Sequence, residues 1–238
     1  FEVKFADKDN VEHFAWQTSW GVSWRLIGAM IMAHGDDKGL VLPPKVAPMQ
    51  IVIVPIYRNE EGKNSVLPKV EEIQNKLELN DIRIHVDDRE GLSPGYKFND
   101  WELKGVPLRI EIGPKDIENQ KMVVAKRYNQ EKIDLSFEEI EKIPLILEEI
   151  QTEMLKKAKE QANDNTLEII NYSDFKSKIE KGGFFNSPWC GQLECEDKIK
   201  EETGAEIRVI PFNSEDNTKE CIYCKKQSVS VPIFARGY

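Results

Sequence analysis

The chain has 238 residues, of which 40% are hydrophobic and 32% are charged. This balance is typical of a folded globular protein and excludes a disordered one. The net charge of −9 argues against a protein that binds nucleic acid over its whole surface, but it leaves room for a local basic face. No apolar run approaches the roughly 20 residues of a membrane helix, and the length allows one large or two small domains.

The first part of the chain, residues 1–47, has the pattern of a domain that began further upstream. FEVKFA alternates as a strand does, Asp9-Asn10 forms a turn, and residues 13–17 form a returning strand. Ser23 is expected to cap or open a helix that runs to about His34. Helical spacing predicts that this helix buries one face, made of Leu26, Ile27, Met30 and Ile31. The sequence opens on Phe1 without a signal-peptide pattern, so we expect a fragment.

Two features of this part bear on chemistry. A glycine turn followed by Arg25 at the start of the helix would hold a guanidinium over a polyphosphate, and the positive end of the helix would add to its charge. At the other end, His34 is expected to cap the helix, because a helix C-terminus favours a cation. The loop carboxylates Asp36 and Asp37 are common features of a helix end, and we assign them no role in the chemistry.

From Gln50 onward, strand and helix patterns alternate. Strands are predicted at residues 51–57, 82–86, 107–112 and 122–127, and helices at residues 65–79, 95–104 and 137–161. Such alternation predicts a mixed or parallel sheet covered by helices. Pro144 is expected to interrupt or kink the last helix early. The run Asn163-Asp164-Asn165 breaks that helix and marks a boundary.

Past this boundary the pattern predicts a small α+β domain. A short strand at residues 167–170 precedes a helix that Ser173 caps, and further strands follow at residues 206–210 and 228–234. Because a strand pattern leads into the last residues, we expect the C-terminus at Tyr238 to be anchored rather than frayed.

Four cysteines lie in this last part and nowhere else. They form a CxxxxC pair and a CxxC pair: Cys190, Cys195, Cys221 and Cys224. Two close-spaced pairs are typical of a tetrahedral zinc site, and a full shell of four thiolates leaves no open position, so the zinc would be structural. A CxxC redox pair is a competing interpretation, but no thioredoxin-like context surrounds it. Secreted disulfides are the other alternative, and the lack of a signal-peptide pattern counts against them.

Three blocks of the sequence resemble class II prolyl-tRNA synthetases of the archaeal and eukaryotic type. WQTSWGVSWRLIGAMIMAHGDDKGLVLPPKVAP, starting at Trp16, resembles motif 3 of that family. SPGYKFNDWELKGVPLRIEIGPKD, starting at Ser93, resembles its class IIa anticodon-binding domain, and the cysteine segment with a terminal tyrosine is similar to its extra zinc domain. The resemblance implies three parts: residues 1–47 end an antiparallel-sheet catalytic domain, residues 48–163 form a mixed-sheet α/β anticodon-binding domain, and residues 164–238 form the α+β zinc domain.

The resemblance also implies an activity. Members of the family activate L-proline with ATP, assisted by Mg²⁺, and pass the prolyl group to tRNA(Pro). Arg25 matches the arginine that contacts the γ-phosphate, Ser23 the hydroxyl near the nucleotide, and Gly21 the close approach to the adenylate. Trp20 would wall the amino-acid pocket, with Gln17 and Ser19 on its floor. Trp24 departs from the small hydroxyl residue of many relatives. Tyr238 is expected to pack back toward the catalytic core.

For the anticodon, the residue pattern indicates a region. Asp87, Asp88, Arg89 and Lys97 lie at or near strand ends, where α/β sheets place ligand crevices. Acidic and basic groups together can read guanine, which proline anticodons contain.

The resemblance further implies a cytoplasmic homodimer that has no membrane segment. Motifs 1 and 2 are absent, so this stretch alone should be inactive. The alternatives are a non-catalytic paralogue that serves as an RNA-binding or scaffold protein, and a stand-alone zinc redox protein.

Overall fold

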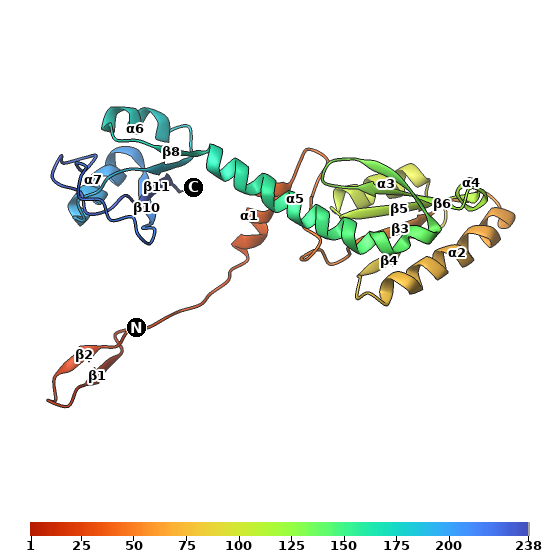
Figure 1. Ribbon diagram of the computed structural model, residues 1–238, viewed down its shortest axis with the longest axis horizontal. Coiled ribbons are helices and arrows are strands. Elements are labelled where there is room, and N and C mark those ends of the chain that lie inside the picture. Colours follow the sequence, from red (N-terminus) through yellow and green to blue (C-terminus); the bar gives the residue numbers. More distant parts are fainter. Residues whose placement is uncertain (238) are drawn as a thin grey trace. The chain divides into compact units, whose positions relative to one another are not determined.

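The computed structural model describes residues 1–237, which form two compact units, Phe1–Gln151 and the residues from Thr152 onward (Figure 1). The division falls inside one long helix, α5 (Ile143–Asp164), which ends where the sequence predicted that the helix would break. Among the described residues, no helix is long and apolar enough to cross a membrane. The predicted packing of Tyr238 lies outside the described residues.

The first unit begins with an antiparallel hairpin and a helix. Strands β1 (Lys4–Ala6) and β2 (Glu12–Phe14) pair through the predicted turn, and helix α1 (Arg25–His34) follows. The prediction that this helix buries one face is wrong for the described chain, because none of the 10 residues of α1 is buried. The apolar stripe is present in the sequence, but Leu26, Ile27 and Ile31 are exposed and only Met30 is half-buried. Ser23 precedes the N-cap, and its Oγ accepts a long hydrogen bond of 3.4 Å from the Arg25 amide.

A five-stranded mixed sheet forms the body of this unit. Its order is β4-β3-β5-β6-β7, with β3 (Ile51–Pro55) parallel to both β4 (Ile84–Val86) and β5 (Leu108–Ile112). Strands β6 (Lys121–Lys126) and β7 (Lys132–Ser136) continue the sheet in antiparallel pairing. The predicted mixed sheet is confirmed. Strand β7 was not predicted, because KIDLS is short and mostly polar.

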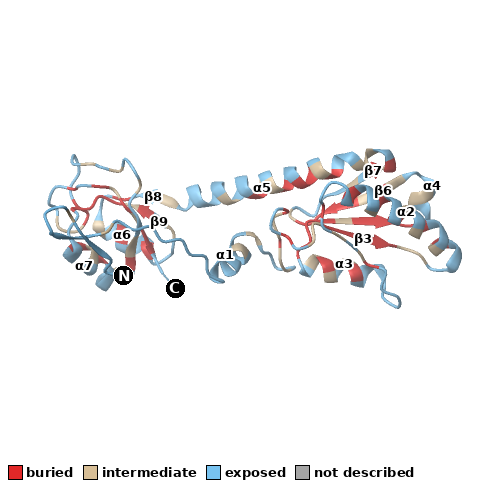
Figure 2. Cartoon of the chain, turned by 90° about the horizontal axis from the view of Figure 1, so that it is seen from below, coloured by how far each residue is buried: buried red, intermediate tan, exposed pale blue. Residues whose placement is uncertain are grey.

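Helices cover the two faces of this sheet unequally (Figure 2). Helix α2 (Glu60–Glu78) packs on β3 and β4, and α5 lies on the same side, preceded by a 3₁₀ segment, η1 (Phe137–Lys142). The predicted interruption is confirmed, because α5 restarts one residue before Pro144. On the opposite face, α3 (Pro94–Leu103) buries Val52 and Val54 of β3 under Trp101. A one-turn helix, α4 (Pro114–Glu118), links β5 to β6.

The sheet register decides what lies beside α3. Val52 pairs with Arg109 and Val54 with Glu111, so these two charged residues of β5 share the face that α3 covers. On the next strands, Arg109 is opposite Ala125, and Ala125 is opposite Lys132. The apolar floor under α3 therefore gives way to a charged floor on the outer strands.

The second unit is a smaller α+β body. Its strands are β8 (Thr166–Glu168), β9 (Phe184–Asn186), β10 (Ala205–Val209) and β11 (Ile233–Arg236), in the order β10-β11-β9-β8. Its helices are α6 (Tyr172–Ile179) and α7 (Leu193–Thr203). Phe175, Phe185 and Phe234 form its core with edge-to-face contacts. The predicted cap of α6 is wrong: Asn171, not Ser173, is the N-cap, because its side chain already accepts the free amides of the first turn.

A buried carboxylate joins β4 to α3. Asp87 follows β4 and is fully buried; its carboxylate accepts two hydrogen bonds from Arg89, of 2.8 and 2.7 Å, and one of 2.7 Å from Trp101 Nε1. The Lys97 ammonium donates to its backbone oxygen at 2.9 Å. Burial alone raises the pKa of Asp87, but these hydrogen bonds and the Lys97 charge outweigh it and hold the pKa well below its ordinary value. The carboxylate therefore stays charged and organises α3.

We predict that Asp87→Asn destabilises the chain by about 3 kcal/mol, since it leaves the buried Lys97 ammonium without its counterion. Because the folded pKa is lowered, the contribution of Asp87 is complete above its ordinary value near 3.8 and is lost as the pH falls further. Urea unfolding across this pH range measures both effects. The exposed neighbour Asp88 provides the control, Asp88→Asn. Equal stability of the two variants at pH 7 would contradict the prediction.

Candidate functional site

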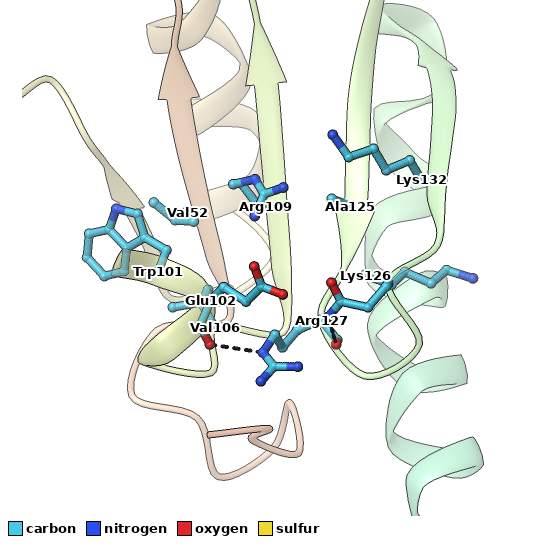
Figure 3. Close-up of a pocket in the computed structure, with 10 residues that line it drawn as sticks. Val52, Trp101, Glu102, Val106, Arg109, Ala125, Lys126, Arg127 and Lys132 are labelled. Carbon is cyan, nitrogen blue, oxygen red and sulfur yellow. Dashed lines mark hydrogen bonds between the residues drawn. The ribbon is translucent and has the colours of Figure 1, made fainter. Parts of the chain in front are cut away.

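A small polar cavity lies where the charged floor of the sheet meets the end of α3 (Figure 3). Its volume is about 40 Å³. The polar residues around it come from α3, β5, β6, β7 and the β6–β7 turn: Glu102, Arg109, Lys126, Arg127, Gln130 and Lys132. We call this site the base pocket, after the basic side chains that surround it. Such a volume is too small for a whole ring system, but it can receive the polar edge of one.

Glu102 provides the acceptor of the base pocket. Figure 3 shows its carboxylate pointing into the space between Arg109 and Arg127. Its Oε1 atom is buried and forms no hydrogen bond with any described residue. Lys38 Nζ lies 3.3 Å away, but the geometry is that of a charge contact and not of a hydrogen bond. A buried carboxylate oxygen without a hydrogen bond is free to accept one from a ligand or a water molecule.

Arg109 and Lys132 provide cationic donors. Glu111 holds both of them: its Oε1 accepts from Arg109 Nη2 at 2.9 Å and from Lys132 Nζ at 3.1 Å. The Arg109 guanidinium also lies over the Phe98 ring, 4.3 Å from its centroid. This cation–π contact helps to hold the guanidinium in place. Lys132 is half exposed, so it can reach a ligand from the open side.

Arg127 closes the inner end of the base pocket. Its guanidinium is only 3% exposed and forms a bidentate pair with Asp36, at 2.6 and 2.7 Å. Its Nε donates to the backbone oxygen of Glu102 at 2.9 Å. The hydrogen bonds from Arg127 lower the pKa of the Asp36 carboxyl to about 2. Asp36 received no role from the sequence, yet it neutralises a buried cation of this site.

The predicted anticodon residues lie elsewhere. Arg89 and Lys97 line a crevice of about 270 Å³ at the carboxyl ends of β3 and β4, as the strand-end rule predicts. Asp87 lies beneath them with its carboxylate engaged, and Asp88 is exposed. Sequence reasoning missed the base pocket. The available signal was the LRIEI strand, where two charged residues alternate inside an apolar run.

The predicted nucleotide-binding residues are exposed in the described chain. They are Gln17, Ser19, Trp20, Gly21, Ser23 and Arg25. Trp20 is 94% exposed. Arg25 is the first residue of α1, as predicted. The described cavities are lined by other residues, so the contacts of this group stay a prediction.

The four cysteines meet in the second unit, as predicted. Cys190 follows β9, Cys195 lies on α7, and Cys221 and Cys224 lie on a turn before β11; all four sulfur atoms are within 4.8 Å of one another. The Cys190 sulfur is 3.5 Å from that of Cys195 and 3.6 Å from that of Cys224. A disulfide would require about 2.05 Å. Four thiolates around one ion at about 2.3 Å would stand about 3.8 Å apart, so the group is suited to hold a metal ion.

The thiols of this cluster differ in acidity. Burial raises the pKa of Cys195. Burial acts in the same direction on Cys224, but hydrogen bonds from the Lys226 amide and the neighbouring thiols outweigh it and lower its pKa to about 7. Cys224 therefore offers a thiolate near neutral pH, which is the form that binds metals.

Comparison with known proteins agrees with both units. Residues 50–146 match the family model of the anticodon binding domain, and residues 172–238 match that of the prolyl-tRNA synthetase C-terminal domain. The whole chain is 53% identical to a proline–tRNA ligase of Cenarchaeum symbiosum and 44% identical to proline–tRNA ligase 2 of Clostridioides difficile. It spans about half the length of these relatives, 50% and 49%.

A solved structure agrees as well. The crystal structure of the prolyl-tRNA synthetase of Cryptosporidium parvum complexed with L-proline and AMP superposes on this chain with a TM-score of 0.89 at 37% identity. The match covers 99% of this chain and 50% of the Cryptosporidium parvum chain. In sequence and in the fold of both units, the chain is therefore similar to the C-terminal half of prolyl-tRNA synthetases.

Proposed function

We propose that the chain is the tRNA-reading and metal-bearing part of an enzyme that activates L-proline with ATP and transfers it to tRNA(Pro). The anticodon is read in the base pocket. The observation that carries this proposal is the buried Glu102 oxygen without a hydrogen bond, which faces cationic donors inside the segment that matches an anticodon-binding domain.

Guanine fits the base pocket chemically. Its Watson–Crick edge carries two adjacent N–H donors and one carbonyl acceptor. A carboxylate such as Glu102 accepts from both donors, and Arg109 or Lys132 donates to the carbonyl. Single-stranded RNA is read by such edge contacts together with stacking on aromatic or guanidinium planes. The Arg109 guanidinium, supported by Phe98, provides a plane of this kind. The crevice beside Asp87, Asp88, Arg89 and Lys97 is a second candidate for contacts with the same loop of RNA.

The first part of the chain contributes to catalysis in this proposal. Arg25 neutralises the γ-phosphate of ATP, with Ser23 and Gly21 beside the nucleotide and Trp20, Gln17 and Ser19 around the amino acid. Mg²⁺ bound with ATP supplies charge to the phosphate oxygens. Proline activation requires little covalent chemistry from the protein, so fixed cations and positioning account for most of the catalysis.

The remaining assignments follow from the same resemblance. The metal is Zn²⁺ with a structural role, because its ligands are four thiolates. The parts of the chain are residues 1–47, 48–163 and 164–238, the enzyme is a homodimer, and it works in the cytoplasm.

The base pocket predicts selective loss of RNA binding. A proline anticodon stem-loop should bind the full chain, and replacing its guanines by inosine, which lacks the 2-amino group, should cost about 1.5–3 kcal/mol for one hydrogen bond to a charged acceptor. Glu102→Gln should weaken binding of the guanine RNA and remove most of the difference between guanine and inosine. Fluorescence anisotropy measures both affinities.

The matched control is Glu118→Gln, which removes the same charge from the exposed end of α4. It should leave binding and discrimination unchanged. Equal behaviour of the two glutamine variants would show that the anticodon is read elsewhere.

The assignment of Arg25 predicts a kinetic effect. In an enzyme of the full length of its relatives, Arg25→Ala should lower ATP–pyrophosphate exchange about 10²- to 10³-fold, the usual cost of one preorganised charge-stabilising group. Arg25→Lys should recover only part of this rate, since an ammonium lacks the forked geometry of a guanidinium. Near-normal exchange by a folded Arg25→Ala enzyme would contradict the assignment.

The metal assignment predicts a stability effect. One zinc ion per chain should be found by metal analysis, and the double variant Cys221→Ser/Cys224→Ser should lose the ion together with the folding free energy that binding contributes. Calorimetry should then show a lower melting temperature for the second unit, while the first unit melts as before. An unchanged melting profile with no bound metal would refute the structural role.

A further inference from the structure

The loop that follows α1 is docked on the back of the base pocket. We call residues 36–42 the docking loop. Asp36 forms the bidentate pair with Arg127, and Lys38 Nζ contacts two other residues of the pocket: it donates to Gln130 Oε1 at 3.1 Å and lies 3.3 Å from Glu102 Oε1. Lys38 therefore touches the same carboxylate oxygen that is left without a hydrogen bond.

The backbone of the docking loop is fixed to the end of α3. The amides of Leu40 and Leu42 donate to the carbonyls of Leu103 and Gly105, at 3.0 and 3.3 Å. Two glycines make this approach possible. A Cβ on Gly39 would lie 2.6 Å from the Leu103 oxygen, and a Cβ on Gly105 would lie 2.6 Å from the Leu40 backbone. Both glycines have positive φ angles, which residues other than glycine rarely adopt.

The docking loop is continuous with α1. The last helical hydrogen bond of α1 runs from the Gly35 amide to Ile31 at 2.7 Å, and Asp36 is the next residue. A helix of 10 residues is about 15 Å long. Arg25 is at its far end, and the extended Gly35 joins its last turn to Asp36.

We propose that Lys38 and Asp36 are positioning residues, which couple occupancy of the base pocket to the docking loop and through it to α1. The inference rests on the proposed function of the base pocket. A guanine edge bound to Glu102 would place its donors beside Lys38, because a carboxylate has enough lone pairs to accept from both. The bound base then fixes Glu102, Lys38 and the docking loop together. By reciprocity, a fixed docking loop presents Glu102 in the orientation that binds the base.

This coupling predicts a change in hydrogen exchange. Amide exchange of the full chain should slow in the docking loop and in the last turn of α1 when the proline anticodon stem-loop saturates the protein. Lys38→Met should abolish this slowing and weaken the binding of guanine RNA by about 5-fold or more, the lower end of typical coupling. Its discrimination against inosine should also fall. Lys38 is largely exposed, so the substitution should leave the fold intact.

The matched control is Lys45→Met. Lys45 lies close by on the same chain segment, is similarly exposed, and pairs with Glu148 instead of a residue of the base pocket. Lys45→Met should leave the RNA affinity and the slowing of hydrogen exchange as they are in the unsubstituted chain. Asp36→Asn is the second variant: it releases the buried Arg127 guanidinium, so the docking loop should exchange quickly with and without RNA.

The outcomes separate the two proposals. If Glu102→Gln leaves RNA binding unchanged, the base pocket does not read the anticodon, and the proposed coupling fails as well. If Glu102→Gln weakens binding but Lys38→Met matches Lys45→Met in both affinity and exchange, the base pocket stands and the coupling is overturned. Slowed exchange in the unsubstituted chain that Lys38→Met removes would establish it.

Discussion

The buried guanidinium of Arg127 is the constraint on which the arrangement of the first unit depends. A charge that is 3% exposed is tolerated only when it is paired and hydrogen-bonded. Its partners are the Asp36 carboxylate and the Glu102 carbonyl, which lie 91 and 25 residues away in the sequence. Satisfying this one cation brings three segments to one place: the docking loop, the end of α3 and the end of β6. The base pocket is the space that these segments leave between them.

The net charge of −9 does not prevent a local basic site, because a few cations gather at one place. Arg109, Lys126, Arg127 and Lys132 all lie around one small cavity. Two of them are held by acidic partners on the far side: Arg127 by Asp36, and Lys126 by Glu131 and Glu149. Arg109 and Lys132 share Glu111 and keep donors for a ligand. Recognition of this kind depends on the geometry of individual groups more than on the overall field.

The two units differ in the size of their apolar cores and therefore in what stabilises them. The first buries a continuous apolar layer under α2 and α5, which a sheet of five strands can support. The second has one compact aromatic core and a separate cluster in which Trp189 packs with cysteines. A small body with so little apolar core gains much of its stability from a cross-link. Four thiolates on three different segments would supply that cross-link through a metal ion.

Sequence patterns predicted the elements whose signals are local. Helical spacing located α2 and α3, apolar runs located β3 and β5, and the paired cysteines predicted a group that the fold assembles. The helices α4 and α7 were missed, and so were the strands β7 and β9. These two strands are short and mostly polar or flanked by glycine, so periodicity has too few residues to act on. The cap of α6 was misplaced by two residues, since Asn171 and Ser173 are both good caps and only the backbone chooses between them.

By itself, the sequence determined most of the elements along the chain, their alternation into a sheet covered by helices, and the two cysteine pairs, because each of these depends on residues close together in the chain. Only the tertiary structure decided which charged residues meet. Sheet register put Arg109 and Lys132 on one face, two glycines let the docking loop reach α3, and a buried cation recruited Asp36. These contacts join residues far apart in the sequence. A local pattern cannot predict them, because each pair forms only when the chain folds.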